Sequence, residues 1–358
     1  MWGALGYAAW LALWAPAGSV ATDPDAPWIR YRLGQGETLE SVATRYDVGI
    51  EEIVAANERR SDFRKGDIIR LQPRKFVPPR ASKTIKSSER RTWEQVAQRH
   101  GVEGEALRRW NPRLAKRARV PSGATLTVWF DSGVTRFPYA TDPEPLPDFE
   151  TRGAGYSIGK PHRGRIENAV QLPASDHYTI RFDRVAWGSS LAVRNIQRAL
   201  AGFRRDSGYA GPLLIGGMSR KTGRRLRPHR SHQSGRDIDV RLPAMSFATG
   251  YRLQANEIDW HATWMLVEAF VRTDAVQVIF LERKLFARLR SAAMRMGADD
   301  ARIQQVMKRV RHSKGHTGHI HVRFVCAPEA AQCVQARDRD ATQPQQADSE
   351  QTANPLEP

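Results

Sequence analysis

Apolar residues recur at helical spacing in the first part of the chain. Positions three or four apart are apolar, namely Leu39, Val42, Ala43 and Tyr46. This spacing predicts a short amphipathic helix. A second helix is expected around residues 51–56 and a closing strand over residues 66–71, so the pattern predicts a small βααβ unit.

The same pattern returns with an offset of 54 residues. Residues 38–48 align with residues 92–102, and Asn57 in the first copy aligns with Asn111 in the second. Each copy closes with a glycine and an alternating strand, over residues 66–71 and 123–128. Self-similarity at a fixed offset predicts two copies of one structural unit.

The largest block, residues 151–337, is predicted to be one α+β domain. Helices are expected over residues 191–203, 260–271 and 284–296, and strands over residues 213–218, 237–242 and 276–281. Near the end of the block, apolar Ile320, Val322 and Phe324 alternate with His319, His321 and Arg323. This alternation predicts a strand with one apolar and one polar face.

The segments between these units have a different composition. Residues 74–88 are rich in Pro, Lys and Ser, and residues 131–150 are rich in Pro and acidic side chains, so both are interpreted as linkers. Residues 338–358 lack apolar periodicity and are expected to be a disordered tail.

Residues 1–21 indicate export. They are uncharged and rich in apolar side chains, and they end in Ser19-Val20-Ala21, a small-x-small cleavage pattern. No basic residue precedes Arg30, which departs from the usual signal peptide. The segment is interpreted as a signal peptide, and a buried N-terminal helix is the alternative.

The charge of the chain calls for anionic surroundings. The formal net charge is +18, and 41% of the residues are hydrophobic, as in a globular protein. Basic residues are spread along the chain, and the sequence has no zinc-finger, basic-zipper or RNP signature. An anionic envelope polymer or a membrane surface therefore fits the charge as well as nucleic acid does.

The two cysteines, Cys326 and Cys333, lie close together in the sequence. They could be core residues, metal ligands or a disulfide. In an exported protein, a local disulfide that closes a small loop is favoured.

Six of the ten histidines lie in two short windows, residues 229–239 and 312–324. On a strand, residues two apart share a face, so His319 and His321 are expected to project together, as are Asp237 and Asp239. His232 precedes the first of these strands by a turn that contains Gly235. Neutral imidazoles with one carboxylate favour zinc and leave a coordination position for water.

The pattern His232-x2-Gly235-x3-Asp239 with a distant His319-x-His321 resembles the LAS-type zinc metallopeptidases, and most closely the penicillin-insensitive murein endopeptidase family. The likeness runs from Tyr156 to Cys333 and includes the cysteine loop. It implies a central antiparallel sheet with flanking helices and one Zn²⁺ per chain. It also implies hydrolysis of peptide cross-links of peptidoglycan, in the periplasm.

The resemblance also assigns roles to residues. It makes His232, Asp239 and His321 the zinc ligands, with His319 and His316 as catalytic histidines beside them. It places His229 in the cleft and Asp237 behind a ligand. Arg230, Arg236 and Lys314 would flank the site and engage substrate carboxylates. His312 is expected to be a solvated residue at a helix end.

The two repeats resemble the LysM module, which binds glycans containing N-acetylglucosamine. Residues 29–73 carry its usual opening, Tyr31 to Leu39, whereas residues 89–130 lack that opening and form a degenerate second copy. The resemblance implies that the modules tether the chain to peptidoglycan. The alternative is that they are packing spacers.

Three other functions are alternatives to this one. Ser157-Ile158-Gly159-Lys160 and Lys221-Thr222-Gly223 imitate elements of penicillin-binding serine enzymes, but they are too close together for that fold. A non-catalytic peptidoglycan-binding protein with a vestigial metal site is the second alternative, and a nucleic-acid-binding protein is the third. The sequence leaves open which cross-link would be cut and what the oligomeric state is.

Overall fold

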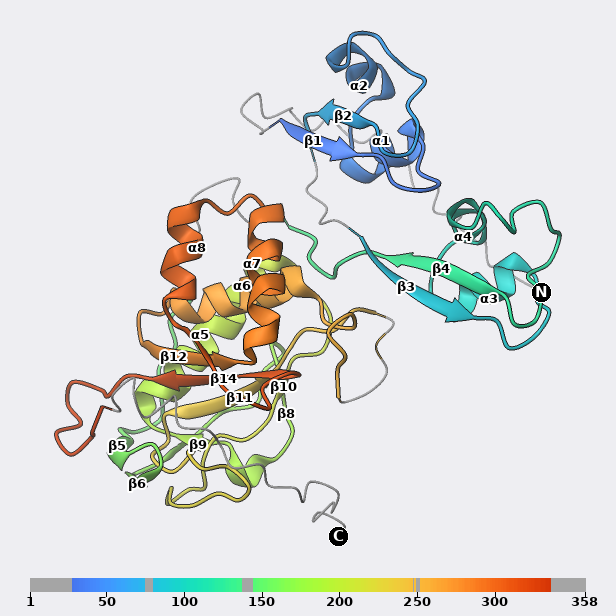
Figure 1. Cartoon of the computed structure of the whole chain (residues 1–358). Helices are drawn as coiled ribbons and strands as arrows, with labels where there is room; N and C mark the ends of the chain where they lie inside the picture. Colours follow the sequence, from blue (N-terminus) through green and yellow to red (C-terminus); the bar gives the residue numbers. More distant parts are fainter. Residues whose placement is uncertain (1–27, 75–79, 137–143, 247, 249–251, 336–358) are drawn as a thin grey trace, which may run out of the picture.

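The computed structural model describes residues 28–74, 80–136, 144–246, 248 and 252–335. Two small units precede one large α+β domain, as predicted (Figure 1). The predicted signal peptide and the predicted disordered tail lie outside the described residues. Within the described ranges, no helix combines the length and the apolar character needed to cross a membrane.

The first module has the expected βααβ order. Its elements are β1 (Ile29–Arg32), α1 (Leu39–Tyr46), α2 (Ile50–Ala56) and β2 (Ile68–Leu71). Helix α1 begins after Thr38 because the Thr38 and Ser41 side chains each accept a hydrogen bond from the other's backbone N–H. The core forms because Val42, Ile53 and Ile69 are fully buried between the helices and the two antiparallel strands.

The second module starts earlier than predicted. Its elements are β3 (Ala81–Lys86), α3 (Trp93–Arg99), α4 (Gly104–Trp110) and β4 (Thr125–Phe130). Strand β3 pairs with β4 along its whole length, from Ala81 opposite Phe130 to Lys86 opposite Thr125. Part of the predicted linker 74–88 is therefore a strand. The segment is rich in Ser, Lys and Thr, so its composition did not predict a strand. The pairing with β4 stabilises it as one.

Each module has an asparagine that makes the same set of hydrogen bonds. The Asn57 side-chain amide donates to the carbonyls of Ile53 and Arg70, and its carbonyl accepts from the Arg70 backbone N–H. Asn111 makes the equivalent bonds to Leu107 and Thr127. The repeated asparagine therefore ties the end of the second helix to the closing strand, which explains its place in the repeat.

The large domain contains one six-stranded sheet in the order β13-β12-β14-β11-β10-β8. The strands are β8 (Thr179–Ile180), β10 (Leu214–Ile215), β11 (Asp237–Arg241), β12 (Val276–Leu281), β13 (Val310–His312) and β14 (His319–Phe324). The four central strands, β10, β11, β14 and β12, are antiparallel to their neighbours in this group. At the two edges of the sheet, β8 pairs in parallel with β10, and β13 pairs in parallel with β12. The predicted strand at 213–218 is reduced to Leu214–Ile215.

Helices pack on the apolar side of this sheet. They are α5 (Ser190–Ser207), α6 (Trp260–Val271), α7 (Phe286–Arg295) and α8 (Asp300–Met307). Ile238 and Val240 of β11 and Ile320 of β14 are fully buried in the same core as these helices. In Figure 1, α6, α7 and α8 lie on one side of the sheet and the hairpin of β5 and β6 lies on the other.

Shorter elements complete the domain. They are β5 (Tyr156–Lys160), β6 (Arg163–Glu167), β7 (Val170–Gln171), η1 (Asp183–Val185), β9 (Trp187–Gly188) and η2 (Arg283–Leu285). The predicted disulfide is confirmed, because Cys326 and Cys333 are bonded. It closes a short loop that lies against β5, where the Gly159 N–H donates to the Gln332 carbonyl.

The second predicted linker, residues 131–150, is packed in its described parts. Val134 is 2% exposed, and the Ser132 hydroxyl and the Gly133 N–H both donate to the carboxylate of Asp259. Met245, which follows β11, belongs to the apolar core of the second module. The second module and the large domain are therefore joined by specific contacts.

Candidate metal centre

The pairing of β11 with β14 brings the two sequence windows together. Asp239 lies directly opposite His321, and Asp237 lies opposite Arg323. These side chains occupy the face of the sheet turned away from the helices, because the alternate residues are buried in the helical core. Two segments more than 70 residues apart in the sequence therefore present their polar side chains to one place.

His232 is held in one tautomer by its surroundings. Its ring is fully buried, and Nδ1 lies 2.6 Å from the Met218 carbonyl oxygen. A carbonyl can only accept, so Nδ1 carries the proton and Nε2 keeps a free lone pair. The backbone of His232 has φ of 63°, which is uncommon for a residue other than glycine. Its N–H donates to Asp237, and this bond helps to hold that conformation.

The turn between His232 and β11 requires Gly235. Its φ is 72°, and a Cβ there would lie 2.7 Å from Ile166 Cδ1 and 2.9 Å from the Ser189 nitrogen. Any other side chain would push the turn away from its neighbours. This glycine was predicted to reverse the chain ahead of the strand, and it does.

His321 is oriented by Asp237. Nε2 of His321 lies 3.0 Å from Asp237 Oδ1, and Arg323 Nε donates to the same oxygen at 2.7 Å. Although burial opposes its ionisation, Arg323 and His321 hold the pKa of Asp237 well below its ordinary value. An ionised carboxylate only accepts, so Nε2 of His321 carries the proton and Nδ1 faces Asp239.

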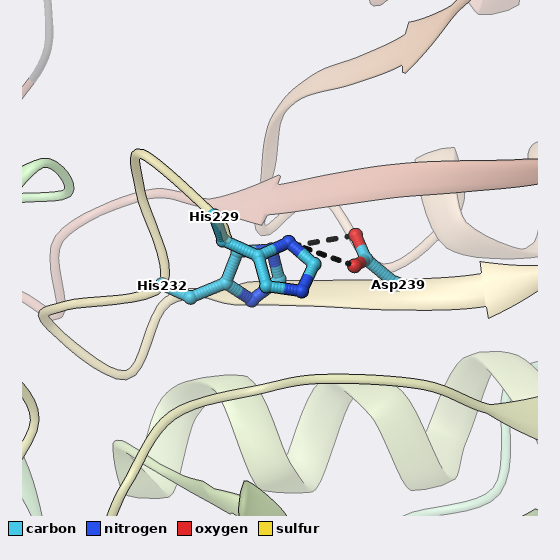
Figure 2. Close-up of side chains that lie close together, drawn as sticks. All are labelled: His229, His232 and Asp239. Carbon is cyan, nitrogen blue, oxygen red and sulfur yellow. Dashed lines mark ion pairs between the residues drawn. The ribbon is translucent and has the colours of Figure 1, made fainter. Parts of the chain in front are cut away.

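Three ring nitrogens converge on Asp239. Nε2 of His232 and Nδ1 of His321 each lie 3.3 Å from Asp239 Oδ1, and Nδ1 of His229 lies 3.5 Å from Oδ2. Figure 2 shows His229, His232 and Asp239 turned toward one another. The candidate ligand atoms of these three residues all lie within 4.8 Å of one another.

Two of the converging atoms lack hydrogen-bond partners. His232 Nε2 and Asp239 Oδ1 are buried, and no described residue hydrogen-bonds to either. Both carry lone pairs, and burial without a partner is unfavourable for such atoms. A cation between them would satisfy both, so the donor set of imidazoles and one carboxylate fits a metal ion.

His316 and His319 lie beside this cluster. Their ring centres are 4.8 Å apart, and the His316 ring is 5.8 Å from that of His321. Burial lowers the pKa of His316 to about 3, and it lowers the pKa of His319 as well. Both imidazoles are therefore neutral near pH 7.

His229 lies at the edge of the cluster. Its side chain is 33% exposed, whereas that of His232 is fully buried. Burial also lowers the pKa of His229, to about 4. The structure thus places every histidine that was assigned to the site within one group.

Two residues, Arg236 and His312, do not lie where the sequence predicted them. Arg236 is fully buried, and its guanidinium donates to the carbonyls of Phe324 and Val334. It therefore binds the chain after β14 and is not available to a substrate. His312 is not at a helix end, because it closes β13 and its Nδ1 accepts from the Arg283 N–H. Arg230 and Lys314 are exposed.

Two neighbours of the site were missed in the sequence. Phe280 of β12 lies opposite His321, with ring centres 5.3 Å apart, and it covers that side of the imidazole. The Met218 carbonyl orients His232. An apolar strand residue and a backbone oxygen carry no chemical signature in a sequence, so neither could be found without the fold.

Two models of known protein families match the chain, and one of them covers the candidate metal centre. The family model of penicillin-insensitive murein endopeptidase matches residues 157–354, which is more than half of the chain. The chain belongs to the penicillin-insensitive murein endopeptidase family. The matched range contains all the histidines of the candidate centre. The LysM domain model matches residues 31–63, within the first module.

Curated relatives support the same family. The chain is 28% identical over 212 residues to a penicillin-insensitive murein endopeptidase of Yersinia pestis bv. Antiqua, which covers 54% of this chain and 73% of the relative. It is 26% identical over 211 residues to that of Yersinia enterocolitica, with the same coverage. It is 28% identical over 230 residues to that of Salmonella typhi, which covers 58% of this chain and 79% of the relative.

Proposed function

We propose that the chain is an exported, zinc-dependent murein endopeptidase that hydrolyses peptide cross-links of peptidoglycan. Family membership supports the peptidase activity and its substrate. The zinc ligands would be His232, Asp239 and His321. One observation supports this set above others: both imidazole nitrogens lie 3.3 Å from the same oxygen, Asp239 Oδ1.

The 3.3 Å separation between each imidazole nitrogen and Asp239 Oδ1 is suited to zinc. With metal–ligand bonds of ~2.0–2.1 Å, the edge of a coordination tetrahedron is ~3.3–3.4 Å. Two imidazoles and one carboxylate form one of the donor sets found in catalytic zinc sites, and three protein ligands leave one position open. When bound, zinc lowers the pKa of a coordinated water and polarises a carbonyl group.

His319 and His316 would handle the proton and the substrate. Both imidazoles are neutral, and their rings contact each other. Nδ1 of His316 lies 3.2 Å from the Lys314 carbonyl, so this nitrogen donates and Nε2 is left to accept. In this tautomer His316 is suited to accept a hydrogen bond from substrate or water, and His319 to act as the base.

The modules would hold the enzyme near its substrate. The LysM match covers most of the first module, and the net charge of +18 favours an anionic wall. Tethering to glycan raises the effective concentration of the peptidase around the cross-links. The periplasm is the compartment in which this substrate and the disulfide occur together.

The serine-enzyme alternative is disfavoured by the fold. Ser157 and Lys160 lie on one strand, β5, three positions apart, so their side chains point to opposite faces. Ser157 is 2% exposed, whereas Lys160 is exposed. The hydroxyl and the amine therefore cannot act together on one substrate.

The test is digestion of defined muropeptide dimers, followed by mass spectrometry of the products. A chelator should abolish cleavage, added zinc should restore it, and a β-lactam should have no effect. His319→Ala should abolish cleavage while the chain still binds zinc and murein sacculi. Inhibition by the β-lactam alone would refute the proposal. A zinc-loaded chain that binds sacculi but cuts no dimer would instead be a binding protein.

A further inference from the structure

The solvent side of the first module's sheet has an unusual composition. Along β1 and β2 the side chains alternate, and Ile29, Tyr31, Ile69 and Leu71 point toward the module core. The other set points to solvent, and we call it the outer face. It consists of Arg30, Arg32, Ile68 and Arg70, together with Trp28, which directly precedes β1, and all five are exposed.

The outer face exposes two large apolar side chains. Trp28 is 49% exposed and Ile68 is 41% exposed. Among the described residues, the other large hydrophobic side chains with comparable exposure are Met294 and Val334, in the peptidase domain. Trp28 and Ile68 lie at opposite ends of the strand pair, because Ile68 pairs with Arg32 and Trp28 directly precedes β1. Arg30 and Arg70 lie between these two exposed apolar side chains.

The same face carries three arginines that the described residues do not neutralise. Arg30 lies directly opposite Arg70 in the antiparallel pair, and like charges in that position repel. Nearby carboxylates are engaged elsewhere, since Asp67 pairs with Arg60 and Glu52 pairs with Arg74. The repulsion would be relieved by an anion bound across the two strands.

Two of the three arginines are also held in place. The Arg70 guanidinium carbon lies 4.4 Å from the ring centre of Trp28, and Arg32 donates a hydrogen bond to the Gly66 carbonyl. Stacking on the indole restricts Arg70 while leaving its N–H groups free to bind an acceptor. The face is thus a partly ordered array of guanidinium groups around an indole and an aliphatic side chain.

We propose that the outer face binds the surface of a membrane containing anionic phospholipids. Guanidinium groups bind phosphate, an indole ring favours the headgroup region, and an aliphatic chain gains by entering the acyl boundary. Neutral glycan would leave the three arginines without partners, and an acidic polymer would leave Ile68 without one. A lipid surface accounts for all three residue types and would place the peptidase between membrane and wall.

The experiment is sedimentation of the chain from Thr22 to Pro358, which keeps every described residue, with sucrose-loaded vesicles. Vesicles of phosphatidylcholine alone are compared with vesicles containing ~30% phosphatidylglycerol. Binding is expected only to the anionic vesicles and should weaken as salt is raised. Each arginine near such a surface contributes roughly fivefold to binding, so Arg30→Gln with Arg70→Gln should lower the partition coefficient roughly 25-fold. Adding Trp28→Ala should lower it further.

A matched control is available on α7. Arg288→Gln, Arg290→Gln and Met294→Ala remove the same charge and an exposed apolar side chain from the peptidase domain. Cleavage of soluble muropeptide dimers should be unchanged in the outer-face variant, and its thermal unfolding temperature should not fall, because the Arg30–Arg70 repulsion is removed. Failure of this inference is therefore distinct from failure of the peptidase assignment. Equal loss of vesicle binding in both variants would reduce the effect to net charge and overturn the proposal. Weaker binding to sacculi with unchanged vesicle binding would assign the face to a wall polymer and also overturn it.

Discussion

At the scale of single residues, the candidate centre depends on which ring nitrogen of each histidine carries the proton. The Met218 carbonyl accepts a hydrogen bond from His232 Nδ1, and Asp237 accepts one from His321 Nε2. Each partner leaves the other nitrogen directed at Asp239. Metal-binding histidines in general are oriented by such hydrogen bonds, whose loss weakens metal binding roughly 10–100-fold.

The third ligand can be tested by substitution. His321 faces the orphan oxygen of Asp239, whereas His229 faces the other oxygen and is one-third exposed. His321→Ala should therefore leave well under one zinc per chain after dialysis, and the matched His229→Ala should retain the metal. Atomic emission on both variants, with circular dichroism as the check on folding, decides between them. Retention by His321→Ala and loss by His229→Ala would make His229 the ligand.

At the scale of elements, α6 supports the site strands from behind and is buried on almost every side. It also buries a titratable group, because His261 is 8% exposed and its Nε2 has no hydrogen-bond partner among the described residues. Burial, and to a smaller extent Arg295 of α7, lowers the pKa of His261 to about 4. The folded chain therefore resists protonation of this ring.

The burial of His261 predicts that the free energy of unfolding of the chain falls in acid. In the unfolded chain His261 takes up a proton near pH 6.5, whereas in the folded chain it does so only near pH 4. The contribution of the neutral ring to the free energy of unfolding is therefore fully present above pH 6.5 and is lost as the pH falls toward 4. Between pH 7 and 4.5 the loss from this residue is on the order of 2 kcal/mol. His261→Phe should reduce the pH dependence of urea unfolding by that amount. Identical pH profiles for the two chains would contradict the assignment.

At the scale of the whole molecule, the first module contacts the second, and the second module contacts the large domain. A Cβ at Gly36 of the first module would lie 2.5 Å from the Arg109 carbonyl oxygen of the second, which shows how closely the two modules approach. Asp259 caps α6 through the Ala262 N–H and also accepts from Ser132 and Gly133. One carboxylate therefore joins the start of a core helix to the chain that leaves the second module.

Removing this carboxylate should separate the units. Asp259→Ala deletes the helix cap and leaves buried donors unpaired, at an expected loss of about 2 kcal/mol in unfolding free energy. Limited proteolysis should then cut near residues 131–136 faster than in the parent chain. The control is Asp148→Ala, whose side chain is 88% exposed and lies in the same connector. Equal effects of the two substitutions would show that the contact with Asp259 does not hold the units together.

The sequence by itself determined the features that depend on local pattern. The 54-residue repeat, the alternation in β11 and β14, and the turn at Gly235 are visible because each is set by spacing or by one backbone angle. The histidine windows and the family likeness followed from the same short segments.

Only the tertiary structure decided the features that depend on distant partners. Strand β3 is stabilised by β4, and Arg236 is buried because the Phe324 and Val334 carbonyls accept hydrogen bonds from its guanidinium group. The nitrogens of His232 and His321 that face Asp239 are selected by a backbone oxygen and a buried carboxylate, which bind the other nitrogen of each ring. Hydrogen bonding and burial act through space, so no spacing along the chain could have specified them.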